Sequence, residues 1–246
     1  GFSDGTKDGG YFMANWSIYK AKEDLTQLSK QYGLNVAFFD GRGGPPARGG
    51  GNTHQFYSSM GNKIQADDIQ LTVQGQTISS NFGTEDSCQY NLEQLLSSGI
   101  QNQVFDSERS NLINDDRETL MILASESHDK YQNFKSHPDF LAYLEEMTTL
   151  HYYSKANIGS RPSKRGSSSK LDFSDLRAIP FVGSWSQSKQ NVPGFFGVGT
   201  ALKSFEANDE FDRVTQLYER CSFFKTLIAN SMMSLTKSFF ALTAHM

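Results

Sequence analysis

Apolar side chains recur at helical spacing in the first part of the chain. After a glycine-rich opening, they return largely at intervals of about three or four residues and stop before Gly33. This spacing gathers them on one face of a helix, and a glycine is a typical C-terminal stop. The positions that define this predicted helix are Phe12, Trp16, Tyr19, Leu25, Leu28 and Tyr32.

Four segments are predicted to be extended. Residues 34–39 form a nearly continuous apolar run that ends at Asp40, and residues 176–185 form a second such run. Short uninterrupted apolar runs are typical of strands that are buried on both faces. Residues 69–79 are also expected to be extended, and residues 155–159 are a short possible strand.

The rest of the pattern is mainly helical. A short helix is predicted over residues 91–98, and a longer one is expected to begin near Asp115 or Asp116, which are good N-terminal residues. Another helix opens at residues 137–138. The apolar positions between residues 211 and 239 predict one or two long helices.

Ionic residues stand at or just after short apolar segments in several separate places. In an α/β barrel, the strand ends and the loops that follow them gather such residues into one active site. A doubly wound sheet also places ligands at the C-terminal ends of its strands. The pattern leaves both α/β folds open, with a truncated barrel slightly ahead. The residues concerned are Asp4, Lys7, Arg42, Arg48 and Arg161.

Composition narrows the class of protein. The chain has 246 residues, of which 37% are hydrophobic, so residues 1–246 can form one domain with a sizeable core. No apolar stretch approaches the ~20 residues of a spanning helix, and the start lacks a signal-peptide pattern. The two cysteines are too few for a disulfide framework. We therefore expect a cytoplasmic protein with no membrane partner. Because it begins at Gly1, we also expect a piece of a longer protein.

Charge is unevenly distributed along the chain. The net charge of −4 argues against general nucleic-acid affinity. Residues 41–51 nevertheless contain Arg42 and Arg48 without an acidic residue, and residues 161–170 hold four cations without one. An acidic protein with such local basic segments suits a small anionic ligand.

The sharpest chemical feature is the Gly/Arg segment, G-R-G-G-P-P-A-R-G-G-G over residues 41–51. Glycines let backbone N–H groups turn toward an anion, and arginine matches a carboxylate or phosphate with two parallel hydrogen bonds. No Gly-Lys-Ser/Thr follows, so the segment is not a P-loop. A flexible linker and an RGG-like nucleic-acid segment remain open alternatives.

Four further positions are weaker candidates. Asp4 and Lys7 lie three residues apart in a glycine-rich stretch that fits either a Mg²⁺ ligand with a nearby cation or an ordinary helix-entry turn. Arg177, within the second apolar run, fits either an anion ligand or a structural salt bridge, as does Arg161. The histidines form no recognisable metal or catalytic pattern.

Four segments, in order, resemble signatures of the phosphoenolpyruvate carboxylase family. Residues 1–10 resemble G-Y-S-D-S-x-K-D-x-G, and residues 39–50 resemble F-H-G-R-G-G-x-x-x-R-G-G. Residues 160–165 resemble S-R-P-x-K-R, and residues 176–199 resemble L-R-A-I-P followed by W-x-Q and G-x-G. The resemblance extends over nearly the whole chain, and four motifs in the correct order are highly specific.

The resemblance implies a helix-rich partial (β/α)8 TIM-like barrel of the phosphoenolpyruvate/pyruvate type. It implies carboxylation of phosphoenolpyruvate by bicarbonate to oxaloacetate and phosphate with Mg²⁺ or Mn²⁺, an anaplerotic feed of the tricarboxylic acid cycle. It also implies a homo-oligomer, a tetramer in the family, that a dicarboxylate such as aspartate or malate inhibits. A non-catalytic anion-sensing relative is the alternative.

The family's functional residues carry over by motif. Asp4 is expected to be a metal ligand and Lys7 a catalytic cation near the substrates. Arg42, Arg161 and Arg177 are expected to hold the phosphate or carboxylate of phosphoenolpyruvate. The remaining assignments are a catalytic role near bicarbonate for Arg48 on the mobile glycine loop, and dicarboxylate binding for Lys237.

This chain departs from the family pattern at three motif positions. Asp40 stands where the motif has histidine, so a carboxylate replaces a potential proton donor at a catalytic position. Gly5 and Phe2 are milder departures. The family's base histidine, another phosphate-binding arginine and a second metal carboxylate are expected upstream of Gly1, and other inhibitor ligands downstream of Met246. We therefore expect the chain alone to be inactive.

Overall fold

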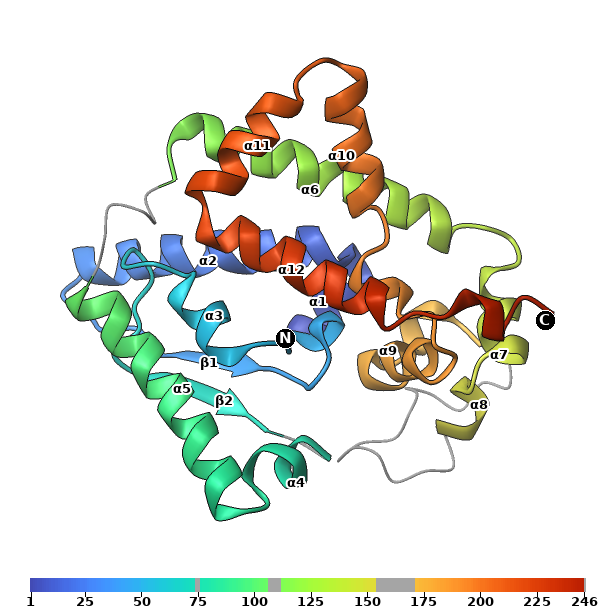
Figure 1. Ribbon diagram of the computed structural model, residues 1–246, viewed down its shortest axis with the longest axis horizontal. Helices are drawn as coiled ribbons and strands as arrows, with labels where there is room; N and C mark the ends of the chain where they lie inside the picture. The colour runs from blue at the N-terminus through green and yellow to red at the C-terminus, as the bar shows by residue number, and fades with distance from the viewer. Residues whose placement is uncertain (74–75, 106–111, 154–170, 246) are drawn as a thin grey trace.

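A computed structural model describes residues 1–73, 76–105, 112–153 and 171–245 of the chain (Figure 1). This part is α/β and rich in helices, which confirms the predicted class. The α-helices are α1 (Phe2–Gly9), α2 (Tyr11–Gln31), α3 (Thr53–Ser58), α4 (Gln76–Phe82), α5 (Glu85–Val104), α6 (Asn114–Lys135), α7 (Phe140–Met147), α8 (Leu150–Tyr153), α9 (Ala178–Gln187), α10 (Val198–Ala207), α11 (Phe211–Arg220) and α12 (Ser222–Thr236). Short 3-10 helices cover Pro46–Arg48, Phe173–Asp175, Val192–Gly194 and Phe240–Leu242.

The glycine-rich opening forms helix α1, followed by the predicted long helix α2. Burial of Phe2, Thr6 and Lys7 on one face of α1 outweighs the low helix propensity of its glycines. Gly10 separates the two helices with φ of 83°, and a Cβ there would lie 3.2 Å from the ring of Tyr131. Only glycine fits this junction, so α1 and α2 meet at a fixed bend.

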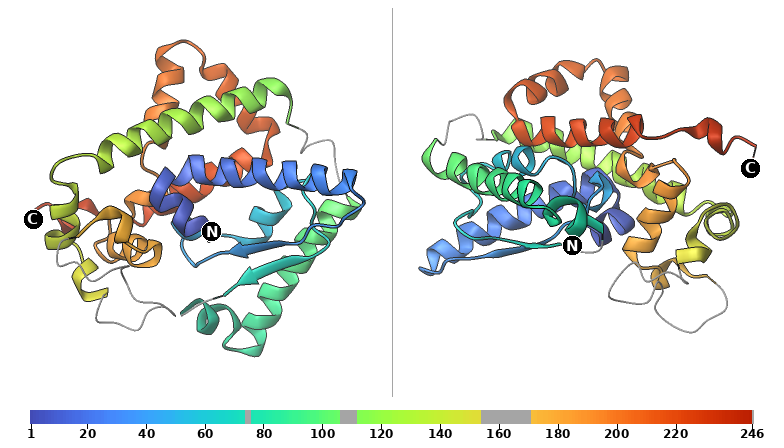
Figure 2. Two further views of the ribbon diagram at one scale, coloured as in Figure 1. Left: turned by 180° about the vertical axis from the view of Figure 1, so that it is seen from behind. Right: turned by 60° about the horizontal axis from the view of Figure 1, so that its bottom comes forward.

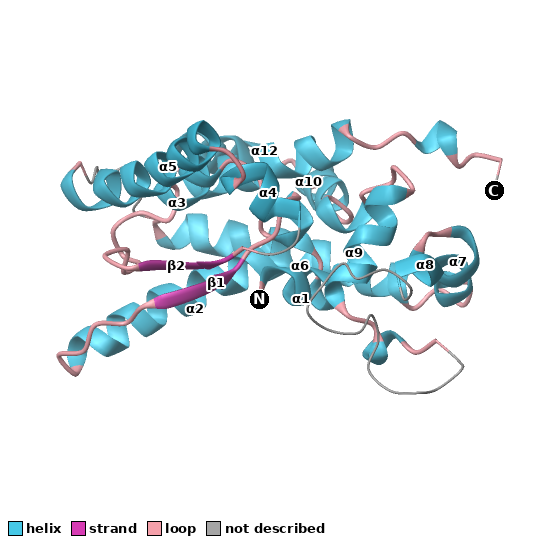
Figure 3. Cartoon of the chain, turned by 90° about the horizontal axis from the view of Figure 1, so that it is seen from below, coloured by secondary structure: helices cyan, strands magenta, loops and turns pink. Residues whose placement is uncertain are grey.

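The described strands are β1 (Phe38–Gly41) and β2 (Ile69–Thr72), which pair in parallel with Phe38 opposite Ile69. Helices α3 and α5 lie on one side of the pair (Figure 3). The strand predicted over residues 34–39 is displaced toward the C-terminus, and its predicted burial is wrong, because Phe39 is 67% exposed. The extended stretch predicted over residues 69–79 ends at Thr72, before α4.

The strand predicted over residues 176–185 is wrong, because most of this run is helix α9. A continuous apolar run is ambiguous between a buried strand and a buried helix. Arg177 is the extended N-cap residue, and Pro180 lies in the first turn, where its missing N–H costs nothing. Packing of Phe181, Val182 and Trp185 into the interior then decides for the helix.

The other helix predictions are confirmed, with shifted ends. The short helix predicted over residues 91–98 is part of the longer α5. Helix α6 begins at Asn114, where the Asp116 carboxylate accepts a hydrogen bond of 3.2 Å from the Ile113 N–H. Helices α11 and α12 account for the last predicted helices. The possible strand over residues 155–159 lies outside the described residues.

Two groups of buried side chains hold these elements together. The larger group joins α1, α2 and α3 to α6 and to α10–α12, and α2 and α6 lie side by side when the molecule is viewed from behind (Figure 2). The smaller group is centred on α7–α9 and includes Phe140, Leu144, Phe181 and Trp185. The first group includes Phe2 of α1, and the second includes Ala47 of the Gly/Arg segment.

Two strands do not test whether a barrel closes, so the partial barrel stays a prediction. Among the helices of the described ranges, none combines the length and the apolar character needed to cross a membrane.

Candidate functional site

Helix α1 holds two of the predicted site residues at different depths. Lys7 is buried, with 6% of its surface exposed, whereas Asp4 in the first turn is exposed. The Lys7 ammonium group therefore lies in the interior, and the Asp4 carboxylate lies at the surface.

Lys7 lies in a small cluster of charges and one aromatic ring. Its Nζ is 2.7 Å from the Asp8 carboxylate, 3.4 Å from the Phe173 carbonyl oxygen and 4.3 Å from the centre of the Phe173 ring. Lys135 Nζ lies 4.6 Å from the same ring and donates to the Asp8 carbonyl oxygen at 2.6 Å. Burial lowers the pKa of Lys135, Asp8 opposes the shift and Lys7 adds to it. Two cations thus converge at this end of α1.

Asp40, at the end of β1, is the second charged centre. Its Oδ2 accepts hydrogen bonds of 2.7 Å from Lys22 Nζ and 2.8 Å from the Tyr57 hydroxyl. Both side chains of the ion pair are buried, with 9% of Lys22 and 6% of Asp40 exposed. Asp40 is therefore neutralised by a lysine from α2 within the fold.

Arg42 follows Asp40 after a tight turn, in which the Arg42 N–H donates to the Asp40 carbonyl oxygen at 3.1 Å. Its guanidinium stacks over Phe56 at 4.3 Å and over Tyr57 at 5.0 Å, and its Nε donates to the Gly49 carbonyl oxygen. Nη2 is buried and has no hydrogen-bond partner within the described part of the chain. Arg42 is thus held rigidly while one buried donor remains unused.

The Gly/Arg segment is folded, so the flexible-linker reading of it is wrong. The Gly43 N–H donates to the Arg48 carbonyl oxygen at 2.7 Å, and a Cβ on Gly43 would lie 2.7 Å from the Arg48 guanidinium carbon. Arg48 Nε donates to Ser3 Oγ at 3.3 Å, which ties the segment to α1. Burial lowers the pKa of Arg48, and the nearby Tyr153 opposes the shift.

Arg177 lies at the N-terminus of α9 rather than inside a strand. Its Nε is buried and unpartnered within the described residues, so a structural salt bridge does not account for that donor. Arg161 lies outside the described residues.

The elements that carry Lys7, Arg48 and Arg177 pack against one another. Helix α1, which carries Lys7, packs against both the Pro46–Arg48 3-10 helix and α9, and these two also contact each other. Arg42 lines a cavity of about 80 Å³, with Gly44, Gly50, Thr72 and Thr77 among its walls. Elements that carry cations from separate parts of the sequence therefore pack against the Gly/Arg segment.

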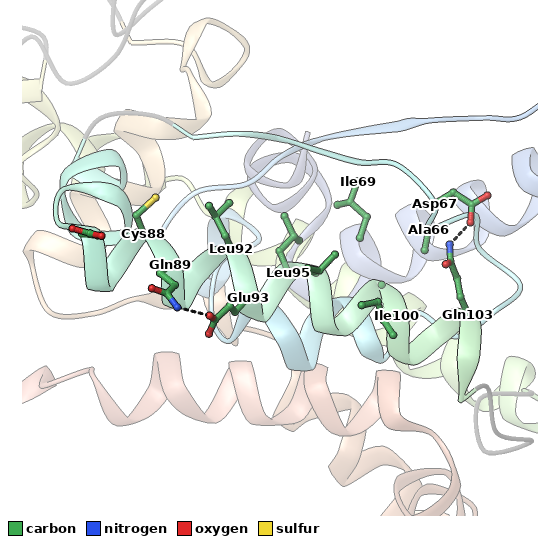
Figure 4. Close-up of a pocket in the computed structure, with 13 residues that line it drawn as sticks. Ala66, Asp67, Ile69, Cys88, Gln89, Leu92, Glu93, Leu95, Ile100 and Gln103 are labelled. Atoms are coloured by element: carbon green, nitrogen blue, oxygen red, sulfur yellow. Dashed lines mark hydrogen bonds between the residues drawn. The ribbon is translucent and has the colours of Figure 1, made fainter.

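A larger groove of about 790 Å³ runs along α5 and is unsuited to an anion (Figure 4). Its walls include Leu92, Leu95 and Ile100, and the charged side chains that line it within the described part of the chain are the carboxylates Asp67, Glu85 and Glu93. Carboxylates would repel an anionic substrate, so size alone does not identify the substrate site here.

Asp4 fits a divalent metal as one ligand of a set. Mg²⁺ commonly takes one or two carboxylates together with substrate oxygens. Within the described ranges, no three His, Cys, Asp or Glu side chains form a metal-binding group.

Lys237 is exposed at the C-terminal cap of α12. Its helix packs against the Pro46–Arg48 3-10 helix, so α12 connects the predicted dicarboxylate position with the Gly/Arg segment.

Sequence reasoning missed Lys22 and Lys135. A signal for Lys22 exists, because it follows Tyr19 by three positions and so shares the apolar face of the predicted helix. A buried lysine needs a partner, but the partner's identity depends on how β1 packs against α2. Lys135 carries a similar signal, because it follows Tyr131 by four positions.

The family model described as phosphoenolpyruvate carboxylase matches residues 1–246, the whole of the chain. The resemblance of the four motifs is therefore confirmed.

Proposed function

The chain belongs to the phosphoenolpyruvate carboxylase family, a family of carboxy-lyases, and we propose that it holds the phosphate, carboxylate and enolate of phosphoenolpyruvate during carboxylation. The reaction joins phosphoenolpyruvate and bicarbonate to give oxaloacetate and inorganic phosphate. In the cell, this reaction would replenish the tricarboxylic acid cycle.

One observation supports substrate binding most directly: Arg42 Nη2 and Arg177 Nε are buried donors without a hydrogen-bond partner in the described residues. Leaving a buried charged donor unpaired costs free energy. An anionic oxygen would pair with such a donor, and a guanidinium matches phosphate or carboxylate. Arg42, Arg177 and, by motif, Arg161 are therefore assigned to phosphoenolpyruvate.

The chemistry places negative charge on two groups in turn. A bicarbonate oxygen attacks phosphorus, the bond from phosphorus to the enol oxygen breaks, and its electron pair remains on the pyruvate enolate. Carboxyphosphate then releases carbon dioxide and phosphate, and the enolate carbon forms a bond to carbon dioxide. Fixed cations in a site that excludes water stabilise such charge without reorganising during the reaction.

Lys7 and Arg48 are the cations assigned to the reacting groups. Lys7 is buried and would stabilise the enolate oxygen, while Arg48, tied to Ser3 on α1, would orient bicarbonate and the carboxyphosphate. Asp40, at the position of the motif histidine, would act on the same segment through its ion pair with Lys22. Asp4 would contribute one carboxylate to Mg²⁺ or Mn²⁺, which would polarise the phosphoryl oxygens.

The remaining proposals concern the whole enzyme. It would be a cytoplasmic homo-oligomer, a tetramer as in the family, and the sheet of this chain would be part of a (β/α)8 barrel. Lys237 would bind an inhibitory dicarboxylate such as aspartate or malate.

An assay of the full-length protein with phosphoenolpyruvate and bicarbonate tests the proposed function. We expect oxaloacetate and phosphate in equal amounts, and near-complete loss of turnover on Arg42→Ala. The 246-residue chain alone should be inactive, and robust oxaloacetate formation by it would refute that part of the proposal. Near-normal kinetics of the Arg42→Ala enzyme would remove Arg42 from the site.

The buried Asp40–Lys22 ion pair also favours a second candidate, a non-catalytic anion-sensing relative, because a carboxylate held in this way has replaced a potential proton donor. That candidate predicts phosphoenolpyruvate binding by the full-length protein without oxaloacetate formation. The same assay, combined with a binding titration, separates the two candidates. The RGG-like nucleic-acid alternative predicts salt-sensitive RNA or DNA binding in a filter-binding measurement.

A further inference from the structure

The ion pair of Lys22 and Asp40 adjoins Arg42, the arginine that is assigned to phosphate. Asp40 is the penultimate residue of β1, and its carbonyl oxygen accepts a hydrogen bond of 3.1 Å from the Arg42 N–H. Tyr57 donates to the Asp40 carboxylate at 2.8 Å, while its ring lies 5.0 Å from the Arg42 guanidinium carbon. Backbone and side chain thus both connect Asp40 to Arg42.

A buried carboxylate at this position opposes anion binding unless it is neutralised. Asp40 carries one negative charge and Arg42 one positive charge, so the two alone would leave no net charge for a phosphate group. Lys22 adds a positive charge 2.7 Å from Asp40 and restores a net charge of +1 to the three residues. Charges interact strongly in such a buried site, because water does not screen them.

Within the described residues, the Lys22 ammonium group forms its ion pair with Asp40. Lys22 is 7% exposed on α2, and its Nζ lies over the Phe38 ring at 5.2 Å. Burial lowers the pKa of Lys22, Asp40 opposes that shift and Arg42 adds to it. The positive charges of Lys22 and Arg42 therefore repel each other, and Asp40 offsets this repulsion for Lys22.

We propose that Lys22 is a positioning residue of the phosphate site: by neutralising Asp40, it lets Arg42 present an uncompensated positive charge to phosphoenolpyruvate. The inference rests on the proposed function and deepens it. It also revises what the departure at Asp40 means, since aspartate at the histidine position is compatible with substrate binding when a lysine accompanies it.

The test compares Lys22→Gln, Asp40→Asn and the Lys22→Gln/Asp40→Asn double variant in the full-length enzyme, with Lys30→Gln as matched control. Lys30 is an exposed lysine of the same helix. We expect Lys22→Gln to raise the KM for phosphoenolpyruvate by about tenfold or more, with a smaller change in kcat, because one unneutralised charge costs on the order of 1.4 kcal/mol or more. The double variant should recover most of this loss, and Lys30→Gln should behave as wild type.

Two outcomes would overturn the inference. One is a KM for phosphoenolpyruvate that Lys22→Gln leaves unchanged while lowering thermal stability, which would make the pair purely structural. The other is an additive effect in the double variant, since a charge pair requires non-additivity. A wild-type enzyme without carboxylase activity would instead defeat the proposed function; phosphoenolpyruvate binding by titration would then still report on Lys22.

If Lys22→Gln does not fold, Lys22→Gln/Asp40→His provides the decisive variant, because it removes both buried charges and restores the motif histidine. Recovery of the KM for phosphoenolpyruvate to within about threefold of wild type supports charge compensation. A folded double variant that cannot bind phosphoenolpyruvate contradicts it.

Discussion

Two lysine–carboxylate pairs at the site have the same length and opposite surroundings. In both, the lysine Nζ lies 2.7 Å from a carboxylate oxygen and the lysine is buried. Asp40, the partner of Lys22, is 6% exposed, whereas Asp8, the partner of Lys7, is 64% exposed. Distance alone therefore does not distinguish the two pairs, but burial of the carboxylate does.

The difference in burial separates two functions for a lysine. A carboxylate in water is screened and well solvated, so Asp8 holds Lys7 weakly and leaves its charge available to a substrate. A buried carboxylate needs its partner, so Lys22 and Asp40 neutralise each other. We infer that Lys7 acts on the reacting groups and that Lys22 acts on Arg42 through Asp40.

The largest expected effect is on the free energy of unfolding, and it comes from breaking the buried Lys22–Asp40 pair. Lys22→Met leaves Asp40 buried without its cation, and we expect the free energy of unfolding of the chain to fall by about 3–5 kcal/mol. Lys22→Met/Asp40→Asn should regain most of this loss. Urea unfolding of the 246-residue chain measures both, with the exposed Lys30→Met as control. Equal stability of Lys22→Met and Lys30→Met would contradict the account of the pair.

Lys7→Met should act mainly on turnover. Losing one fixed cation at the developing enolate charge is expected to lower kcat of the full-length enzyme by about 10²–10³-fold. Steady-state kinetics measure kcat, and circular dichroism checks that the variant folds. If Lys7→Met changed only the KM for phosphoenolpyruvate, the two lysines would have exchanged the roles assigned to them here.

Tyr57, which donates a hydrogen bond to Asp40, should make the stability of the chain depend on pH at high pH. Burial raises the pKa of Tyr57 above its ordinary 10.0, Arg42 opposes the shift and Asp40 adds to it. Above pH 10.0 the unfolded chain loses this proton while the folded chain keeps it, so the stability that Tyr57 contributes declines as pH rises. Tyr57→Phe should make the loss of stability above pH 10 shallower by up to about 1.4 kcal/mol per pH unit.

Urea unfolding of wild type and Tyr57→Phe between pH 8 and pH 11 measures this difference in slope. The exposed Tyr90→Phe is the control. Parallel pH profiles for wild type and Tyr57→Phe would show that Tyr57 ionises alike in the folded and unfolded chains.

The smallest expected effect concerns the exposed pair. Asp8→Asn removes a partner that is 64% exposed, so the free energy of unfolding should change by less than about 1 kcal/mol. High salt should cause little further change in the free energy of unfolding of the Asp8→Asn chain. A loss as large as that of Lys22→Met would mean that solvent exposure does not separate the two pairs.

Sequence periodicity predicted the helices well and the strands poorly. Helix α2 shows its buried face through Phe12, Trp16 and Tyr19. The run that became α9 is apolar at consecutive positions, and such a run fits either structure until its packing is known. The apolar run before Asp40 predicts a buried strand, but Leu34 is 62% exposed and the strand begins only at Phe38.

By itself, the sequence determined the family and the positions of the charged residues, because four spaced motifs specify them without reference to packing. Only the tertiary structure decided which charges are neutralised. Lys22 and Asp40 are 18 residues apart and meet because α2 packs beside β1, while Lys7 meets Phe173 across 166 residues. The strength of an ion pair depends on the water that surrounds it, and exposure to water is a property of the fold.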